Sequence, residues 1–324
     1  MSSRIKNGYD QVIVKNLLTL SDKNYLDNGL CLYDSLKEHS DNFYLHYLAL
    51  DEQTHKVLRE LDLENLFVYS LIDLSIDPDL EILIHNNPSR PIDTSDGQSP
   101  FHWALASFFC NFLVDQYKIP HVMYIDSDIL FYDSVKKIFD SIGEKSIGLI
   151  THKHMKLDKS IRNPGYYNVG VIYFRNNKIG KGCLKFWRDC CVSPNNRFSE
   201  IFGACGDQKY LELFDEFVDK DEIKVIDKDV GHGAPWSFVL FDFISPTRVV
   251  WKDPMHLVLE EDSLEQDIVF NHFSHFTINR ETGTYSMDRN GEWGPRLPRH
   301  PGVVEVYDDY CIKLERTRER YNLP

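Results

Sequence analysis

Residues 121–130 read His121-Val122-Met123-Tyr124-Ile125-Asp126-Ser127-Asp128-Ile129-Leu130, an apolar run that ends in two aspartates one residue apart. The apolar run predicts a buried strand of an α/β sheet. Side chains alternate between faces in an extended chain, so Asp126 and Asp128 project together, roughly 7 Å apart along the chain, and Ser127 projects the opposite way. Two such carboxylates repel each other unless a cation lies between them, and Mg²⁺ or Mn²⁺ prefers oxygen ligands. The stretch predicts a divalent-cation site against a diphosphate; the alternative is a solvated acidic loop.

The composition is that of a folded, acidic globular chain. Its 324 residues, 42% of them hydrophobic, are enough for one elaborate domain or two modest ones. The formal net charge of −14 argues against a nucleic-acid partner, because phosphate neutralisation needs clustered Lys and Arg. The sequence has no run of about 18 apolar residues, so we expect no transmembrane helix, and the N-terminus is too polar for a signal peptide. We therefore expect a cytoplasmic protein, with peripheral attachment to the inner face of the membrane as a further alternative.

The seven cysteines show no Cys-x-x-Cys pair and no histidine at zinc spacing. An odd number in a chain of this length is typical of reduced thiols and not of a disulfide framework. We interpret them as small buried hydrophobic residues.

Apolar runs alternate with helical patterns, which predicts βαβ units and a mostly parallel sheet flanked by helices. Ser21 is expected to cap the helix that follows the first strand. The predicted strands are Gln11–Leu18, Phe43–Leu50, Leu66–Ser70, the strand before Asp126, Ile147–Thr151 and Tyr167–Phe174. The predicted helices are those around Leu26–Leu36, Asp51–Leu61 and Phe101–Tyr117, a short one capped by Ser134, Ile179–Cys191 and Lys209–Phe217.

Two further segments have an expected role. His85–Ser99 is a long loop rich in Pro, Gly and Asn, and a loop of this length in a compact domain is typical of a functional lid. Val303–Tyr321 has an apolar stripe at helical spacing with arginines behind it. This helix either packs on its own chain or on a second copy, or it lies on an anionic membrane surface. Acidic residues interrupt its basic face, which favours packing.

Four motifs carry the functional argument. They are Tyr124-Ile125-Asp126-Ser127-Asp128, Tyr167-Asn168-Val169-Gly170, Gly206-Asp207-Gln208-Lys209-Tyr210-Leu211 and Asn271-His272-Phe273-Ser274-His275-Phe276. In this order and at these separations they resemble the GT-A nucleotide-diphosphosugar glycosyltransferases related to glycogenin and the lipopolysaccharide galactosyltransferases, and among these the uncharacterised bacterial transferases of surface-polysaccharide loci. The resemblance also includes residues 20–26 and Gly233-Ala234-Pro235-Trp236. It covers residues 10–276.

The resemblance implies a metal centre. Asp126 and Asp128 would bind Mn²⁺ or Mg²⁺, with Asp126 also near the donor's ribose, and His272 would complete the metal shell. His275 is the rival three residues further on. Without the resemblance, a lone histidine is usually a structural residue with satisfied hydrogen bonds.

The resemblance also implies contacts to the donor and to the reacting carbon. Asp207 and Gln208 would lie beneath the anomeric carbon as the catalytic pair, although Asp207 is equally suited to cap its helix. Asn168 would contact the donor sugar, although it is also a common turn residue. The family's Gly-x-Lys-Pro-Trp after the metal histidine is absent, which leaves Arg280 or the loop residue Arg90 for the diphosphate. The donor-binding residues expected on this basis are Leu18, Thr19, Tyr25, Asp126, Ser127, Asn168 and Arg280.

The implied fold is an α/β GT-A, Rossmann-like domain over residues 1–254, with a nucleotide-sugar half (about 1–133) and an acceptor half (about 134–254). Residues 255–324 would be a C-terminal extension that supplies the metal histidine and a packing helix. The implied reaction moves a hexose from a nucleoside-diphosphate sugar, a UDP-sugar, to a saccharide or lipid-linked saccharide, with retention. Inversion would need a general base, for which Asp207 is the candidate. The alternatives are a sugar nucleotidyltransferase, for which the chain lacks a glycine- and lysine-rich loop after its first strand, and a non-catalytic sugar- or metal-binding module.

Overall fold

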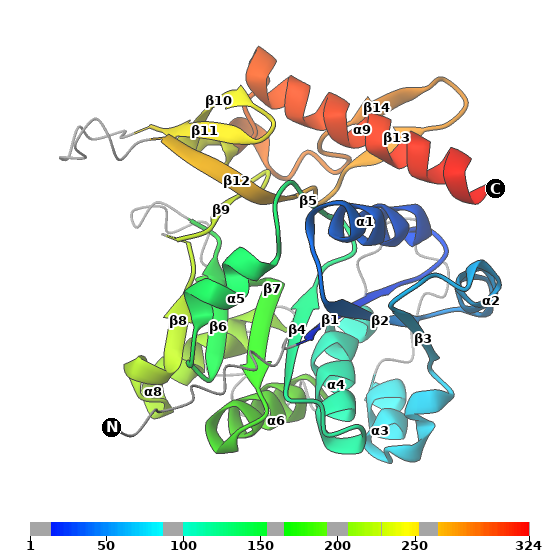
Figure 1. Ribbon diagram of the computed structural model, residues 1–324, viewed down its shortest axis with the longest axis vertical. Helices are drawn as coiled ribbons and strands as arrows, with labels where there is room; N and C mark the ends of the chain where they lie inside the picture. The colour runs from blue at the N-terminus through cyan, green and yellow to red at the C-terminus, as the bar shows by residue number, and fades with distance from the viewer. Residues whose placement is uncertain are drawn as a thin grey trace, which may run out of the picture.

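The computed structural model describes residues 14–86, 100–153, 165–192, 207–227, 229–252 and 265–323. A seven-stranded sheet lies at the centre in the order β3-β2-β1-β4-β7-β6-β8 (Figure 1). Four neighbouring strands, β1 to β4, are parallel, and β7 runs antiparallel to both β4 and β6. The strands are β1 (Lys15–Ser21), β2 (Phe43–Ala49), β3 (Leu66–Ser70), β4 (His121–Ile125), β6 (Ile147–Thr151), β7 (Tyr167–Arg175) and β8 (Ile223–Val225). The mostly parallel α/β sheet expected from the sequence is confirmed.

Helices cover both faces of this sheet. One face packs on α3 (Asp79–Asn86), α4 (Pro100–Gln116) and α6 (Lys178–Val192), and the other on α1 (Leu26–His39), α2 (Glu52–Leu61) and α5 (Lys136–Ile142). Adjacent strand residues therefore enter different cores: Leu17 packs with α1 and Leu18 with α4. Strands covered on both faces read as continuous apolar runs, which explains the pattern of the sequence.

A second, smaller sheet joins the C-terminal region to the segment that follows Asp128. Its order is β10 (Phe241–Ser245), β11 (Arg248–Trp251), β12 (Glu265–His272) and β5 (Ile129–Phe131), and β9 (Gly231–Gly233) also pairs with β12. In this register His272 lies opposite Ile129, and Ile129 is the residue that follows Asp128 in the sequence. The hairpin β13 (Thr277–Asn279) and β14 (Thr284–Ser286) follows. The division of the chain at residue 254 stays a prediction.

The last helix, α9 (Pro301–Tyr321), lies across the small sheet and above α1 (Figure 1). Its apolar stripe is buried in a core made by its own chain, where Tyr310 stacks on Phe273 with ring centroids 3.8 Å apart. The buried α9 residues are Val303, Val306, Tyr307, Tyr310, Leu314 and Thr317. No helix in the described ranges is both long and apolar enough to cross a membrane.

Shorter helical turns link these elements. They are η1 (Asp73–Ile76), η3 (Gln208–Leu213), α8 (Phe214–Phe217), η4 (Lys220–Glu222), η5 (Phe238–Leu240) and η7 (Gly294–Arg296). The helix expected over Lys209–Phe217 is thus a 3₁₀ helix followed by a single α-helical turn.

The end of the first strand was predicted wrongly. The strand continues beyond Leu18 to Ser21, because its pairing with β2 extends to Ala49. Ser21 is therefore not a helix cap: its hydroxyl lies 2.6 Å from the Tyr47 hydroxyl, and α1 begins at Leu26. Ser134 is not the N-cap of α5 either, because that position is Val135, but its hydroxyl accepts a hydrogen bond from the Lys136 amide (3.2 Å). In the expected lid, His85 and Asn86 are the last two residues of helix α3, and residues 87–99, which include Arg90, lie outside the described residues.

Two buried histidines make the stability of the fold depend on pH. The backbone N–H of Asn16 donates to His121 Nε2 (3.2 Å), and the Asn16 amide oxygen lies 3.2 Å from His46 Nε2. Burial lowers the pKa of both His46 and His121 to about 4. The unfolded chain, with ordinary histidine pKa values near 6.5, then binds more protons than the folded chain between pH 6.5 and 4.

We therefore expect the stability that His46 and His121 contribute to be complete above pH 6.5 and to be lost as the pH drops to 4, by about 3 kcal/mol for each of these two histidines. Urea denaturation at pH 7 and pH 4.5 measures this loss. His46→Gln should shrink the loss, whereas the same change at the partly exposed His39 should leave it as in the wild type. An identical pH profile for all three chains would contradict the assignment.

Candidate active site

Three side chains from separate strand ends converge at the edge of the central sheet. Asp126 directly follows β4, and its N–H donates to the Gly170 carbonyl of β7 (3.0 Å). Asp128 precedes β5, and His272 ends β12. His272 Nε2 lies 3.0 Å from Asp128 Oδ1 and 3.7 Å from Asp126 Oδ2. One ligand atom from each of the three residues fits within 4.8 Å of the others, so the structure brings the predicted metal set together.

The electrostatics of this cluster favour positive charge. Burial raises the pKa of Asp126. Burial opposes the charged forms of Asp128 and His272 as well, but their mutual attraction outweighs it, so the pKa of Asp128 is lowered and that of His272 is raised. Two carboxylate oxygens and an imidazole nitrogen are a donor set that fits Mn²⁺ or Mg²⁺. The Tyr124 hydroxyl donates to Asp126 Oδ1 (2.9 Å), while Oδ2 is the oxygen that lies nearest His272.

Gly170 lets His272 approach the central sheet. A Cβ atom at Gly170 would lie 2.8 Å from His272 Nδ1 and 2.6 Å from Asn168 Oδ1, both too close for any side chain. Glycine is therefore needed at this position because the imidazole packs directly against the backbone of β7.

His275 is placed differently. Its Nδ1 lies 3.9 Å from both Asp288 and Glu292, and its ring stacks on Trp293 at 5.0 Å. These three partners of His275 belong to the segment that follows β14, and neither Asp126 nor Asp128 is among them.

Asn168, Asp207 and Gln208 meet beside the cluster. Asn168 lies within β7 and not in a turn, and its amide donates to Gln208 Oε1 (3.2 Å) while its oxygen accepts from Gly170 N–H (2.9 Å). Asp207 opens η3 without a side-chain capping hydrogen bond. The Trp187 indole donates to the Asp207 carbonyl (2.9 Å), so α6 holds this turn in place. Burial, reinforced by the charge of Asp126, raises the pKa of Asp207 to about 8.

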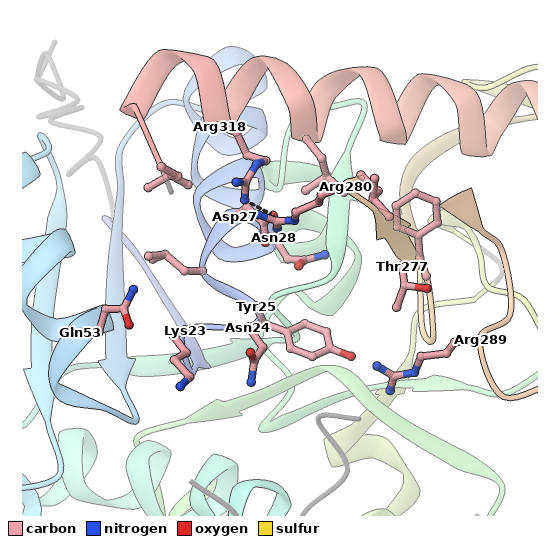
Figure 2. A pocket seen from close by; sticks show the side chains of 15 residues that line it. Lys23, Asn24, Tyr25, Asp27, Asn28, Gln53, Thr277, Arg280, Arg289 and Arg318 are labelled. Atoms are coloured by element: carbon pink, nitrogen blue, oxygen red, sulfur yellow. Dashed lines mark hydrogen bonds and ion pairs between the residues drawn. The ribbon is translucent and has the colours of Figure 1, made fainter. Parts of the chain in front are cut away.

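The remaining donor-site candidates fall into two groups. Leu18, Thr19 and Ser127 are buried, the first two completely, within or just after strands of the central sheet. Tyr25 and Arg280 line a pocket of about 360 Å³ between the start of α1, the β13–β14 hairpin and α9 (Figure 2). Arg280 Nη2 there donates to Asp27 (2.6 Å), which engages its guanidinium in an ion pair.

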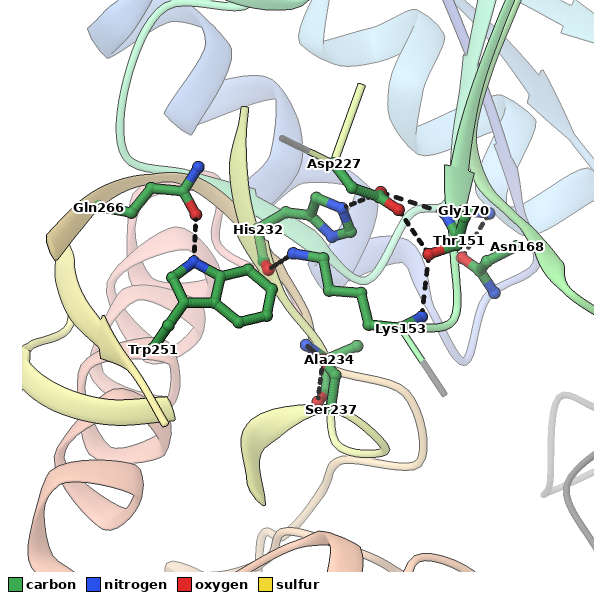
Figure 3. A network of polar contacts seen from close by, with 10 residues as sticks. All are labelled: Thr151, Lys153, Asn168, Gly170, Asp227, His232, Ala234, Ser237, Trp251 and Gln266. Carbon is green, nitrogen blue, oxygen red and sulfur yellow. Dashed lines mark hydrogen bonds and ion pairs between the residues drawn. The ribbon is translucent and has the colours of Figure 1, made fainter. Parts of the chain in front are cut away.

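A polar network beside the cluster joins the two sheets (Figure 3). Asp227 accepts from Thr151 Oγ1 (2.5 Å) and faces His232 Nε2 (2.7 Å), while Lys153 Nζ donates to the His232 carbonyl (2.6 Å). Burial lowers the pKa of Lys153 to about 8, and its ammonium lies 5.0 Å from the Trp251 ring centre. The network fixes the end of β6 against β9 and β11.

Sequence reasoning missed three residues around the site. Trp236 packs edge-on against the His272 ring (5.3 Å), and Arg289 and Arg318 line the pocket. Trp236 lies in a segment that the family resemblance covers, so the resemblance could have pointed to it as a site residue. Arg289 and Arg318 lie beyond residue 276, where nothing in the sequence pointed to a ligand.

Residues 16–184, more than half of the chain, match glycosyl transferase family 8. The chain belongs to this family. As a family 8 member it is a glycosyltransferase, which confirms the resemblance seen in the sequence and decides against the nucleotidyltransferase and the non-catalytic module.

The similarity to relatives of this family 8 chain extends over most of its length. It is 27% identical over 270 residues to the uncharacterized protein YfnF of Bacillus subtilis (strain 168), covering 80% of this chain and 81% of the relative. It is 23% identical over 301 residues to YfnD of the same strain, also uncharacterized, covering 92% and 88%. Among solved structures, the galactosyltransferase LgtC in complex with donor and acceptor sugar analogs shares the fold. The TM-score is 0.53 and the sequence identity 15%, and the match covers 93% of this chain and 95% of LgtC.

Proposed function

We propose that this glycosyltransferase is metal-dependent and moves a hexose from a nucleoside-diphosphate sugar, a UDP-sugar, to a saccharide or lipid-linked saccharide acceptor. The observation that supports this most is the convergence of Asp126, Asp128 and His272 beside Asn168 and Gln208. A site that gathers oxygen and imidazole ligands next to amides and a carboxyl suits both halves of the donor: the diphosphate and the sugar.

Each residue has a distinct task in this proposal. A divalent cation held by Asp126, Asp128 and His272 would neutralise the negative charge on the departing diphosphate. Asn168 and Gln208, which hold each other through an amide hydrogen bond, would orient the sugar hydroxyls. Asp207, in its carboxylate form, would face the positive charge that develops at the anomeric carbon.

Retention is the stereochemical outcome that we propose. The acceptor hydroxyl would then attack from the side of the leaving group, and a diphosphate oxygen would take its proton. Asp207 and Gln208 would stabilise the cationic sugar during this step. The donor test is hydrolysis or transfer with a panel of nucleoside-diphosphate hexoses, in Mn²⁺ and in EDTA; proton NMR of the product gives its anomeric configuration. Equal turnover in EDTA would exclude the metal-dependent mechanism.

His272 and His275 can be separated by substitution. His272→Ala is expected to weaken Mn²⁺ binding at least about 100-fold, because even residues behind a metal ligand alter affinity by 10- to 100-fold. His275→Ala should change it far less, since His275 faces Asp288, Glu292 and Trp293. Isothermal titration calorimetry with Mn²⁺ gives both values. The reverse ranking would assign the metal to His275.

A further inference from the structure

Asp227 lies where the central sheet meets the small sheet, and both of its carboxylate oxygens are engaged (Figure 3). Its Oδ1 accepts from the Thr151 backbone N–H (3.1 Å) and lies 2.7 Å from His232 Nε2. Its Oδ2 accepts from the Thr151 hydroxyl (2.5 Å). The Asp227 side chain is only 16% exposed. A buried carboxylate therefore ties the end of β6 to β9.

This contact is a charged one at neutral pH. Burial opposes ionisation of Asp227, but the hydrogen bond from His232 and the nearby Lys153 ammonium outweigh it, so the pKa of Asp227 is lowered to about 2. Burial lowers the pKa of His232 to about 4. A neutral imidazole thus donates its Nε2–H to an ionised carboxylate, and such charge-assisted hydrogen bonds are shorter and stronger than neutral ones.

On one side, Asp227 is connected to the candidate metal ligand His272. His232 lies opposite Phe270 in the parallel pairing of β9 with β12, and their rings stack with centroids 5.1 Å apart and 7° between the planes. Phe270 and His272 belong to the same strand, β12. Trp236, in the segment that follows β9, packs edge-on against the His272 ring (5.3 Å). The chain around His232 therefore supports His272 from two directions.

On the other side, Asp227 is connected to Asn168. Thr151 precedes His152, and the Asn168 amide donates to His152 Nε2 (3.2 Å). The same amide donates to Gln208 Oε1 (3.2 Å), so its two hydrogens have one acceptor each. The His152 ring also lies 5.3 Å from the Trp236 ring. The position of the β6 end thus affects the amide that we propose for sugar binding.

We propose that Asp227 is a positioning residue for glycosyl transfer. Through Thr151 and His232 it fixes the distance between Asn168 and His272, so that the sugar and the diphosphate of one donor are engaged together. This inference rests on the proposed function, and it assigns a role to a residue that none of the four sequence motifs contains. A misplacement of about 1 Å can cost about 100-fold in rate, so Asp227 influences transfer without touching the donor.

The test uses variants that remove one contact each. Asp227→Ala removes both sides of the connection, and Thr151→Val removes the hydroxyl on the side of Asn168. His232→Phe removes the hydrogen bond on the side of His272 but keeps a ring against β12. Asp227→Asn is the conservative variant, because its amide oxygen can accept from His232 and its NH₂ group can donate to the Thr151 hydroxyl oxygen.

Asp34→Ala is the matched control for the loss of a buried carboxylate. The Asp34 side chain is also 16% exposed, and it accepts from the hydroxyls of Tyr321 (2.6 Å) and Thr317 (3.1 Å), but these contacts join α1 to α9. Each variant is measured for its Mn²⁺ Kd by calorimetry, for its melting temperature, and for kcat and KM with the best donor of the panel. A purely structural contact affects the melting temperature and leaves the Mn²⁺ Kd and the donor KM of the folded protein unchanged.

Asp227→Ala is expected to raise the Mn²⁺ Kd about 10-fold or more, as residues behind a metal ligand do, and to lower kcat/KM about 100-fold. His232→Phe should raise the Mn²⁺ Kd, whereas Thr151→Val should raise the donor KM and leave the Mn²⁺ Kd unchanged. Asp227→Asn should recover most of the activity. Asp34→Ala should lower the melting temperature alone.

Wild-type values of the Mn²⁺ Kd and the donor KM in folded Asp227→Ala, or equal changes in Asp34→Ala, would make Asp227 a structural residue and overturn the inference. If Asp227→Ala did not fold, His232→Phe and Thr151→Val would decide by the same criteria: wild-type values in both would overturn the inference. If the wild type neither bound Mn²⁺ nor used any donor of the panel, the proposed function itself would fail.

Discussion

Asp128→Asn is expected to lower transfer by about 1,000-fold, because a bound cation supplies several kcal/mol to the transition state and each ~1.4 kcal/mol is tenfold in rate. The Asp128 carboxylate lies at a strand end, 3.0 Å from His272 Nε2, and an asparagine of the same size keeps an oxygen there that can accept a hydrogen bond from His272. The melting temperature should therefore stay within a few degrees of the wild-type value. Initial rates with the best donor of the panel, at saturating Mn²⁺, give the loss.

Asp133→Asn is the matched control. Asp133 lies just beyond β5 and pairs with Lys137 on the surface, so its loss should leave activity within about twofold, as for a surface ion pair of small energy. Near-normal transfer by Asp128→Asn, with Mn²⁺ affinity unchanged, would remove the metal assignment.

The second large effect concerns α9. Tyr310→Ala should lower the free energy of unfolding by about 3–5 kcal/mol, the usual cost of truncating a buried aromatic residue. The Tyr310 ring stacks on Phe273, and its hydroxyl accepts a hydrogen bond from Asn28 Nδ2 (2.8 Å). Since domains are stable by only about 5–15 kcal/mol, a chain truncated after Gly302 should not fold. Urea titration of the variant and the solubility of the truncated chain measure these effects.

Ile312→Ala serves as the control on the same helix. Its side chain is 50% exposed, so we expect a change within about 0.5 kcal/mol. If the truncated chain stayed soluble with an unchanged melting temperature, and the full chain bound anionic vesicles at physiological salt, the role of α9 would be membrane binding and not packing on its own chain.

Local sequence patterns predicted the elements well where burial alone decides them. The run before Asp126 became β4, and the period-3.6 pattern at 303–321 became α9, because both patterns reflect which side chains face a core. The end of β1 at Ser21 was missed because partner strands, and not local propensity, determine how far a strand continues.

The candidate site could be predicted only in part. The aspartate pair is visible locally, since two carboxylates follow an apolar strand. His272 needed the family resemblance, because its approach to Asp128 depends on the pairing of β12 with β5. The Asp27–Arg318 ion pair joins residues far apart in the sequence, and no periodicity signals such a contact. For the same reason the pocket wall formed by α9 became visible only in the folded chain.

The pairing of β12 with β5 also orders events during synthesis. When Asp126 and Asp128 leave the ribosome, the strand that carries His272 has not yet been translated, so the nascent chain holds an incomplete set of ligands. A cation that binds only the completed set would stabilise the finished fold and no shorter intermediate. Loading with metal would therefore follow release of the C-terminal region, and Mn²⁺-induced protection from proteolysis would report that translation and assembly of the small sheet are complete.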